Sequence, residues 1–121
     1  MATRHATVTR NPGETEVCES CLVADSFFLR LRGLLGRGEL ADGEGLLLRP
    51  SGSIHTWFMR HPIDAVFLDR DNRVVRTVPA IKPWRTASAG RARAVLELRA
   101  GEAARRGIVV GDRLVVGETH R

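Results

Sequence analysis

The sequence predicts a small α+β domain that is mainly β: a barrel-like mixed sheet with one main amphipathic helix and one short helix. Length and composition are the first observation, because 121 residues with 43% hydrophobic and 27% charged residues suit one globular domain with its own core. Several short apolar runs bounded by glycine, proline, asparagine or aspartate are the second, since this pattern is typical of strands. Short strands need their edges hidden, which favours a barrel.

Two segments carry helix signals. Residues 25–36 begin with Asp25 and Ser26, which suit an N-cap, and end at Gly36, which suits a left-handed closing residue. Between them, apolar residues recur at the spacing of one helical face: Phe27, Phe28, Leu31, Leu34 and Leu35. A second, short helix is predicted at residues 101–107.

The remaining segments predict strands and one ordered loop. Strands are expected at residues 17–24, 46–48, 53–59, 63–69, 73–79, 94–99 and 113–116. The turn-forming residues 69–72 predict a hairpin between the two strands that flank them, and the Gly111-Asp112 pair predicts a tight turn. Residues 80–90 are expected to form the ordered loop. Residues 1–15 are expected to be a flexible N-terminal segment or an edge strand, and residues 16–121 a single globular domain.

Charge narrows the class of partner. The chain carries 19 Lys+Arg against 14 Asp+Glu, a formal net charge of +5, and all but one of the basic residues are arginine. The basic residues are scattered along the sequence, and aromatic residues make up only 5% of the chain. A nucleic-acid-binding surface needs clustered positive charge and aromatic rings on which bases stack. We therefore expect no nucleic-acid partner. A basic module for nucleic acid or an acidic protein, using Arg91, Arg93, Arg105 and Arg106, is kept as an alternative.

The chain shows no targeting or membrane signal. Residues 1–9 lack the apolar stretch of a secretory signal, and no apolar run approaches the length of a membrane span. We expect a cytoplasmic protein without membrane contact, whose partner is a small molecule or another protein.

Three motifs together resemble a known family. They are Arg-Gly-Leu-Leu-Gly-Arg at 32–37, the Ser-Ile-His-Thr-Trp-Phe-Met stretch at 53–59 running into residues 62–68, and Val-Leu-Glu-Leu-Arg-Ala-Gly at 95–101 followed by Gly111-Asp112. In order and spacing they resemble domain of unknown function 192, from about residue 16 to 117. The resemblance implies a compact β-rich fold with one main helix, and it implies no activity.

The segment from residue 53 to 68 concentrates the candidate site residues. In a strand, alternation places His55, Trp57 and Met59 on one face. A polar group beside large soft side chains is typical of a ligand-binding wall. We predict binding of a small ligand or a protein segment at this surface by five residues: His55, Trp57, Met59, Arg60 and Asp64.

An enzyme is the alternative. If the turn between their strands places His55 and Asp64 on one face, the carboxylate could orient the imidazole as a general base. A one-residue change of register separates them. The structural alternative, favoured here, is that the buried carboxylate of Asp64 caps backbone donors and that His55 packs on an aromatic ring.

Cys18 and Cys21 have the spacing of a redox motif or of half a zinc site. A strand at residues 17–24 would point the two thiols to opposite faces, which disfavours a shared metal ion. We therefore predict no metal and no cofactor. Metal binding or redox cycling by this pair is the minor alternative.

Overall fold

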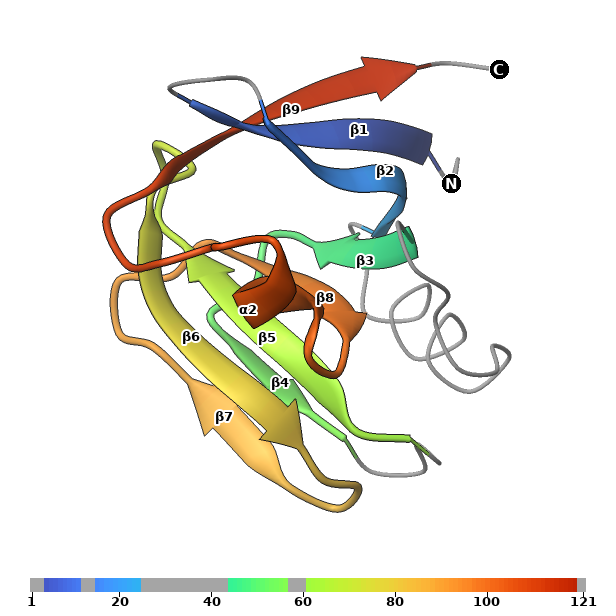
Figure 1. The fold of residues 1–121 in the computed structure, drawn as a ribbon. Helices are drawn as coiled ribbons and strands as arrows, with labels where there is room; N and C mark the ends of the chain where they lie inside the picture. Colours follow the sequence, from blue (N-terminus) through green and yellow to red (C-terminus); the bar gives the residue numbers. More distant parts are fainter. Residues whose placement is uncertain (1–3, 12–14, 25–43, 57–60, 120–121) are drawn as a thin grey trace.

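The computed structural model describes residues 4–11, 15–24, 44–56 and 61–119, with side chains for 45–56 and 61–116. These residues form nine strands and one short helix (Figure 1). The strands are β1 (Arg4–Asn11), β2 (Thr15–Ala24), β3 (Glu44–Leu48), β4 (Ser53–His55), β5 (Ile63–Leu68), β6 (Val74–Ile81), β7 (Thr86–Ser88), β8 (Ala94–Arg99) and β9 (Arg113–Thr119). The helix is α2 (Glu102–Arg105). The mainly β fold with one short helix is confirmed.

Seven strands form one mixed sheet in the order β6-β5-β8-β3-β2-β1-β9. Only β2 and β3 pair in parallel among the described strands, so the prediction of a mixed sheet is correct. β1 pairs with β2 on one side and with β9 on the other. Residues 4–11 therefore form an interior strand, whereas the sequence suggested a flexible segment or an edge strand for residues 1–15.

The predicted barrel is wrong, because the sheet stays open. Its edge strands are β6 and β9, and the bridge between them pairs Arg73 with Arg113. Backbone hydrogen bonds at the same point include the Val74 N–H donating to the Asp112 carbonyl. β9 pairs with β1 along its whole length and meets β6 only where both strands begin. A closed barrel would need backbone hydrogen bonds between β6 and β9 along the length of both strands.

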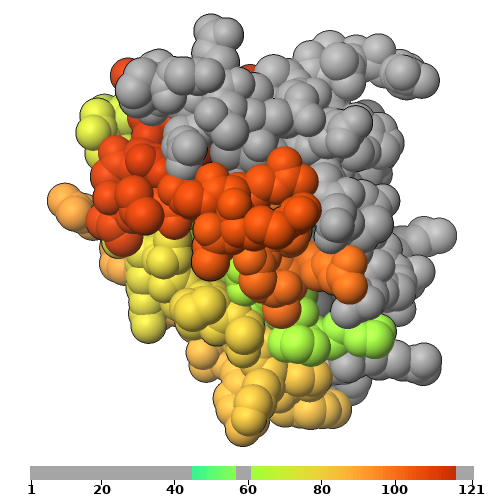
Figure 2. All heavy atoms as spheres, viewed as in Figure 1, coloured from blue at the N-terminus to red at the C-terminus, as the bar shows by residue number. Residues whose placement is uncertain are grey.

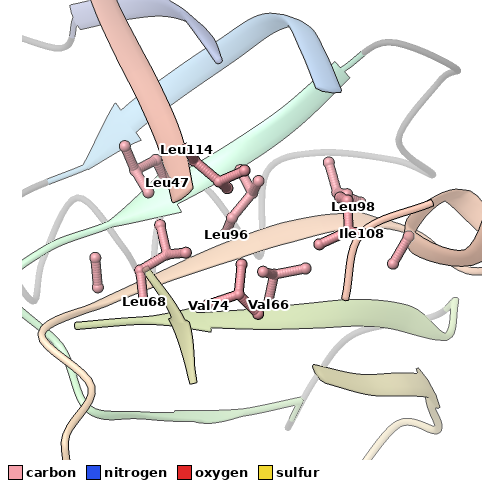
Figure 3. Packing of buried hydrophobic residues seen from close by; sticks show 10 residues of the cluster. Leu47, Val66, Leu68, Val74, Leu96, Leu98, Ile108 and Leu114 are labelled. Carbon is pink, nitrogen blue, oxygen red and sulfur yellow. The ribbon is translucent and has the colours of Figure 1, made fainter. Parts of the chain in front are cut away.

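Both sides of the large sheet are apolar, and alternation along β8 divides its residues between two core clusters. Leu96 and Leu98 belong to the first cluster, with Val66 and Leu114 (Figure 3). Val95 belongs to the second cluster, whose other members include Leu46, Ala65 and Phe67. We call the first side the α2 side, because Ala103 of α2 packs there, and the second the β4 side, because Ile54 of β4 packs there.

The β4 side is covered by a separate two-stranded sheet of β4 and β7. Ile54 lies opposite Ala87, and both contact the second core cluster. Just before β4, Gly52 lies close to the segment that leads into β8, because a Cβ on Gly52 would lie 3.1 Å from the Ala92 carbonyl oxygen. The β4–β7 sheet is therefore packed directly on the main sheet.

Most predicted strands are present with changed ends. Residues 94–99 form a strand with the predicted bounds, and the hairpin around residues 69–72 is confirmed. The strand predicted at 53–59 ends at His55, and residues 57–60 lie outside the described residues, as does the helix predicted at 25–36. The loop predicted at 80–90 is wrong in part, because residues 86–88 form β7. Within the described segments, no helix has the length and apolar character needed to cross a bilayer.

The predicted short helix is confirmed as α2, which lies at the surface beside β6 (Figure 2). Gly101 precedes it with a φ of 94°. Glu102 in its first turn accepts two hydrogen bonds from Arg105, at 2.8 and 2.9 Å, and a longer one from Arg106. The hydrogen bond from Arg105 is the main reason that the pKa of Glu102 lies below its ordinary value of 4.5.

The lowered pKa predicts a pH dependence of stability. The ionised form of Glu102 is stabilised in the folded state, so its contribution is fully present above about pH 4.5 and is lost as pH falls through the lower folded pKa. We expect the difference in unfolding free energy between the native chain and Glu102→Gln to be largest near neutral pH and to shrink in acid. Urea unfolding at several pH values measures it. A difference that stays constant down to pH 3 would contradict the prediction.

Candidate functional site

β4 carries the first of the predicted site residues. Ile54 and Thr56 are buried, whereas His55 between them is half-buried, as the predicted alternation requires. The Nδ1 atom of His55 is nevertheless buried. Trp57, Met59 and Arg60 lie outside the described residues. Of the five predicted binding residues, the structure therefore describes His55 and Asp64.

Asp64 is 1% exposed and binds backbone amides. Its Oδ1 accepts a hydrogen bond from the Ala80 N–H at 2.8 Å, and its Oδ2 accepts two from the N–H groups of Gly101 and Ala103, at 3.0 and 2.9 Å. The register of β5 and β6 shifts between Ile63 and Ala65, so Asp64 lies opposite an irregularity in β6. One carboxylate thus joins β5, the irregular part of β6 and the first turn of α2, as the structural alternative expected.

His55 and Asp64 belong to opposite sides of the large sheet. Asp64 alternates with Ile63 and Ala65, which are in the core cluster of the β4 side, and its hydrogen bonds to α2 place its carboxylate on the α2 side. β4, the strand that carries His55, packs on the other side. The described geometry does not bring the two residues together as an acid/base pair.

The carboxylate that points to the side covered by β4 is that of Glu97, which the sequence reasoning did not single out. Glu97 lies opposite Leu46 in β3 and Ala65 in β5, and both of these belong to the cluster of the β4 side. It is 1% exposed, and both of its carboxylate oxygens are buried. A single charged residue between two leucines of a predicted strand is the signal that could have identified Glu97.

Next to His55, the buried Thr56 holds a short loop, residues 82–85, which we call the Trp84 loop. The Thr56 Oγ1 donates to the Lys82 carbonyl at 2.6 Å and accepts from the Arg85 N–H at 2.9 Å. The Thr56 backbone pairs with the loop as well, because its N–H donates to the Arg85 carbonyl and its carbonyl accepts from the Trp84 N–H. Four hydrogen bonds from one residue fix the loop.

The fixed conformation is a strained one. Trp84 has a φ of 63° and, nearby, Ala80 has a φ of 48°. Positive φ values are rare for residues other than glycine, and each costs on the order of 1–3 kcal/mol unless the surroundings impose it. Asp64 accepts a hydrogen bond from the Ala80 N–H, and Thr56 forms hydrogen bonds with the loop around Trp84. Two buried polar side chains therefore maintain the two positive φ values. The result is a Trp84 side chain that is 58% exposed.

The cysteine pair lies where only the backbone is described. Cys18 and Cys21 both lie in β2, with an irregularity of the β1–β2 register nearby, and their side chains are outside the description. No group of three or more His, Cys, Asp or Glu side chains that could hold a metal is found among the side chains described.

The four arginines of the basic-module alternative lie at two places. Arg91 and Arg93 precede β8, whereas Arg105 and Arg106 follow it and bind Glu102. β8 has six residues, about 20 Å of extended chain, between the two pairs. These arginines therefore do not make one patch.

Comparison with known proteins places this fold in a family. The family model described as Uncharacterized ACR, domain of unknown function 192, matches residues 7–116. A UPF0127 protein of Pyrococcus horikoshii is 44% identical over 66 residues, which cover 52% of this chain and 56% of that protein. A UPF0127 protein of Thermococcus sibiricus is 39% identical over 67 residues, covering 52% and 43%. The match thus spans about half the length of these curated relatives.

Two solved structures share the fold. A protein of unknown function from Novosphingobium aromaticivorans DSM 12444 superimposes with a TM-score of 0.77 at 29% identity, covering 92% of this chain and 83% of that one. A putative transcription regulator from Sinorhizobium meliloti 1021 gives a TM-score of 0.79 at 22% identity, covering 95% and 94%, which shows likeness of fold alone. Since the family model covers most of the sequence, the chain belongs to the domain of unknown function 192 family, a conserved family of uncharacterised proteins.

Proposed function

We propose that this domain binds a small molecule on the β4 side of the sheet, with His55 and Glu97 as its polar contacts. The observation that carries the proposal is the complete burial of Glu97 on the side that bears β4. A carboxylate is rarely buried unless polar groups face it, so Glu97 marks a place on this side of the sheet where polar groups gather. His55 of β4, which alternates with the core-facing Ile54, provides a second polar group, because its Nδ1 atom is buried.

The chemistry of these groups defines the class of ligand. Glu97 in its ionised form accepts hydrogen bonds, and His55 can donate or accept. Leu46, Ala65 and Ile54 make the surroundings on the same side apolar. The ligand we propose is therefore a small molecule with an apolar body and a cationic or hydrogen-bond-donating group. Trp57, Met59 and Arg60, which follow His55 along the chain, remain proposed contacts from the sequence alone.

Asp64 has no part in the proposed binding. Three backbone amides occupy its carboxylate, which lies on the α2 side. The acid/base pair of His55 and Asp64 is accordingly not proposed, and the proposed function is binding.

Native mass spectrometry of the full chain, compared with the denatured chain, tests the proposal. We expect extra non-covalent mass on the native protein, and we expect Glu97→Gln to lose it, because the amide has no negative charge to pair with a cation and keeps only one of the two acceptor oxygens. Glu102→Gln is the matched control: it makes the same chemical change on the opposite side of the sheet and should keep the bound mass. Bound mass retained in both Glu97→Gln and His55→Gln would contradict the proposal.

A further inference from the structure

Two stretches of the sequence that include the strands of the β4–β7 sheet contain no acidic residue. Residues 45–63, which include β4, and residues 72–96, which include β6 and β7, contain no aspartate or glutamate. Residues 72–96 contain six basic residues and so carry a formal charge of +6, more than the +5 of the whole chain. Two of these six, Lys82 and Arg85, lie in the Trp84 loop itself, and Arg76 lies on β6, the strand that leads into the loop.

The Trp84 loop presents an aromatic ring between two cations. Lys82, Trp84 and Arg85 are all exposed, and Lys82 is the single lysine of the chain. Tryptophan and arginine are the residues most enriched where protein partners bind tightly, because they combine a large apolar area with directed hydrogen bonds. An exposed tryptophan loses solvent contact when a partner covers it.

The loop is also rigid before any partner arrives. Its backbone is fixed by four hydrogen bonds to Thr56, a residue that is 0% exposed. A surface whose conformation is already fixed loses little conformational entropy on binding. The positive φ of Trp84 is thus maintained by the protein itself, in the conformation that turns the ring towards solvent.

We propose that the Trp84 loop is a docking site for an acidic segment of another protein. In this arrangement an apolar side chain of the segment packs on the indole of Trp84, while its carboxylates pair with Lys82 and Arg85. An acidic protein segment fits better than nucleic acid, because a strand of bases needs several rings to stack on. Of the two aromatic side chains that the structure describes, Phe67 is buried and Trp84 alone is exposed.

This site is independent of the proposed small-molecule site. It uses the exposed end of the β4–β7 sheet and needs neither Glu97 nor the buried nitrogen of His55. A failure of either proposal leaves the other standing, because Lys82, Trp84 and Arg85 can be changed without altering the side chains that line the β4 side.

Nuclear magnetic resonance of the indole N–H groups of the full chain tests the docking site. The signal of Trp84 is assigned with Trp84→Phe, and the probe is a soluble synthetic peptide that alternates pairs of glutamate with leucine. We expect the peptide to shift the Trp84 signal, and the Lys82→Ala/Arg85→Ala double variant to weaken binding at least tenfold. Both substitutions leave the backbone groups that bond Thr56 in place. The matched control is Arg91→Ala/Arg93→Ala, which removes the same charge elsewhere and should weaken binding less than threefold.

Three results would overturn the inference. The Trp84 signal could fail to respond to the peptide at millimolar concentration. The two double variants could weaken binding equally, which would mean attraction by net charge without a defined site. Oligothymidylate could bind in preference to the acidic peptide, which would assign the loop to nucleic acid.

Discussion

Asp64→Asn lowers the free energy of unfolding by about 3–5 kcal/mol, because the carboxylate serves three buried backbone donors. An asparagine keeps one oxygen but directs an NH₂ group at donors that need an acceptor. The β6 irregularity and the first turn of α2 lose their shared partner together. Urea unfolding at neutral pH measures the change.

Asp71→Asn is the matched control for this loss. Asp71 is exposed in the turn between β5 and β6, so the same substitution there should change stability by no more than about 0.5 kcal/mol. If Asp64→Asn lowered the free energy of unfolding by less than about 1 kcal/mol, the hydrogen bonds of this carboxylate would not be what holds β5, β6 and α2 together.

Thr56→Val is expected to lower the free energy of unfolding by about 2–3 kcal/mol and to loosen the Trp84 loop. Valine has nearly the same shape, so the change removes the hydroxyl that donates to the Lys82 carbonyl and accepts from the Arg85 N–H. Amide hydrogen exchange should become faster at Trp84 and Arg85. Chemical unfolding and exchange measured on the same samples separate the global effect from the local one.

Thr56→Ser provides the control, because it keeps the hydroxyl and removes only a buried methyl group. It should cost about 1 kcal/mol and leave exchange in the loop unchanged. If serine and valine accelerated exchange to the same extent, the hydroxyl would not be what fixes the loop.

Local sequence patterns predicted those elements whose limits are marked in the sequence itself. β8 begins and ends where expected because its apolar residues are bounded by charged or small ones, and Asn72, with a φ of 62°, closes the β5–β6 turn as its residue type allows. β7 was missed because three small residues, Thr-Ala-Ser, have no strand pattern of their own. They form a strand because β4 lies beside them, and β4 is about 30 residues away in the sequence.

The side of the sheet on which a side chain lies depends on contacts between residues that are far apart in the sequence. The strand pattern predicted correctly that Asp64 is buried and that Ile54, His55 and Thr56 alternate. It could not predict that β4 packs on one side of the sheet and that the carboxylate of Asp64 emerges on the other. It also gave no reason to prefer Asp64 over Glu97, since both are single carboxylates in apolar strands. The barrel was wrong for the same reason, because closure depends on the distant pairing of β6 with β9.

The assignment of binding to the β4 side is tested most directly by mapping where small molecules bind. Nuclear magnetic resonance spectra of the backbone N–H groups of the full chain would be recorded in the presence of small aromatic amines, guanidines and carboxamides. We predict that the responding amides cluster at Ile54, His55 and the residues around Glu97, and that Glu97→Gln removes the response. Responses clustered at Asp64, α2 or the arginines before β8, with none around His55 and Glu97, would contradict the account.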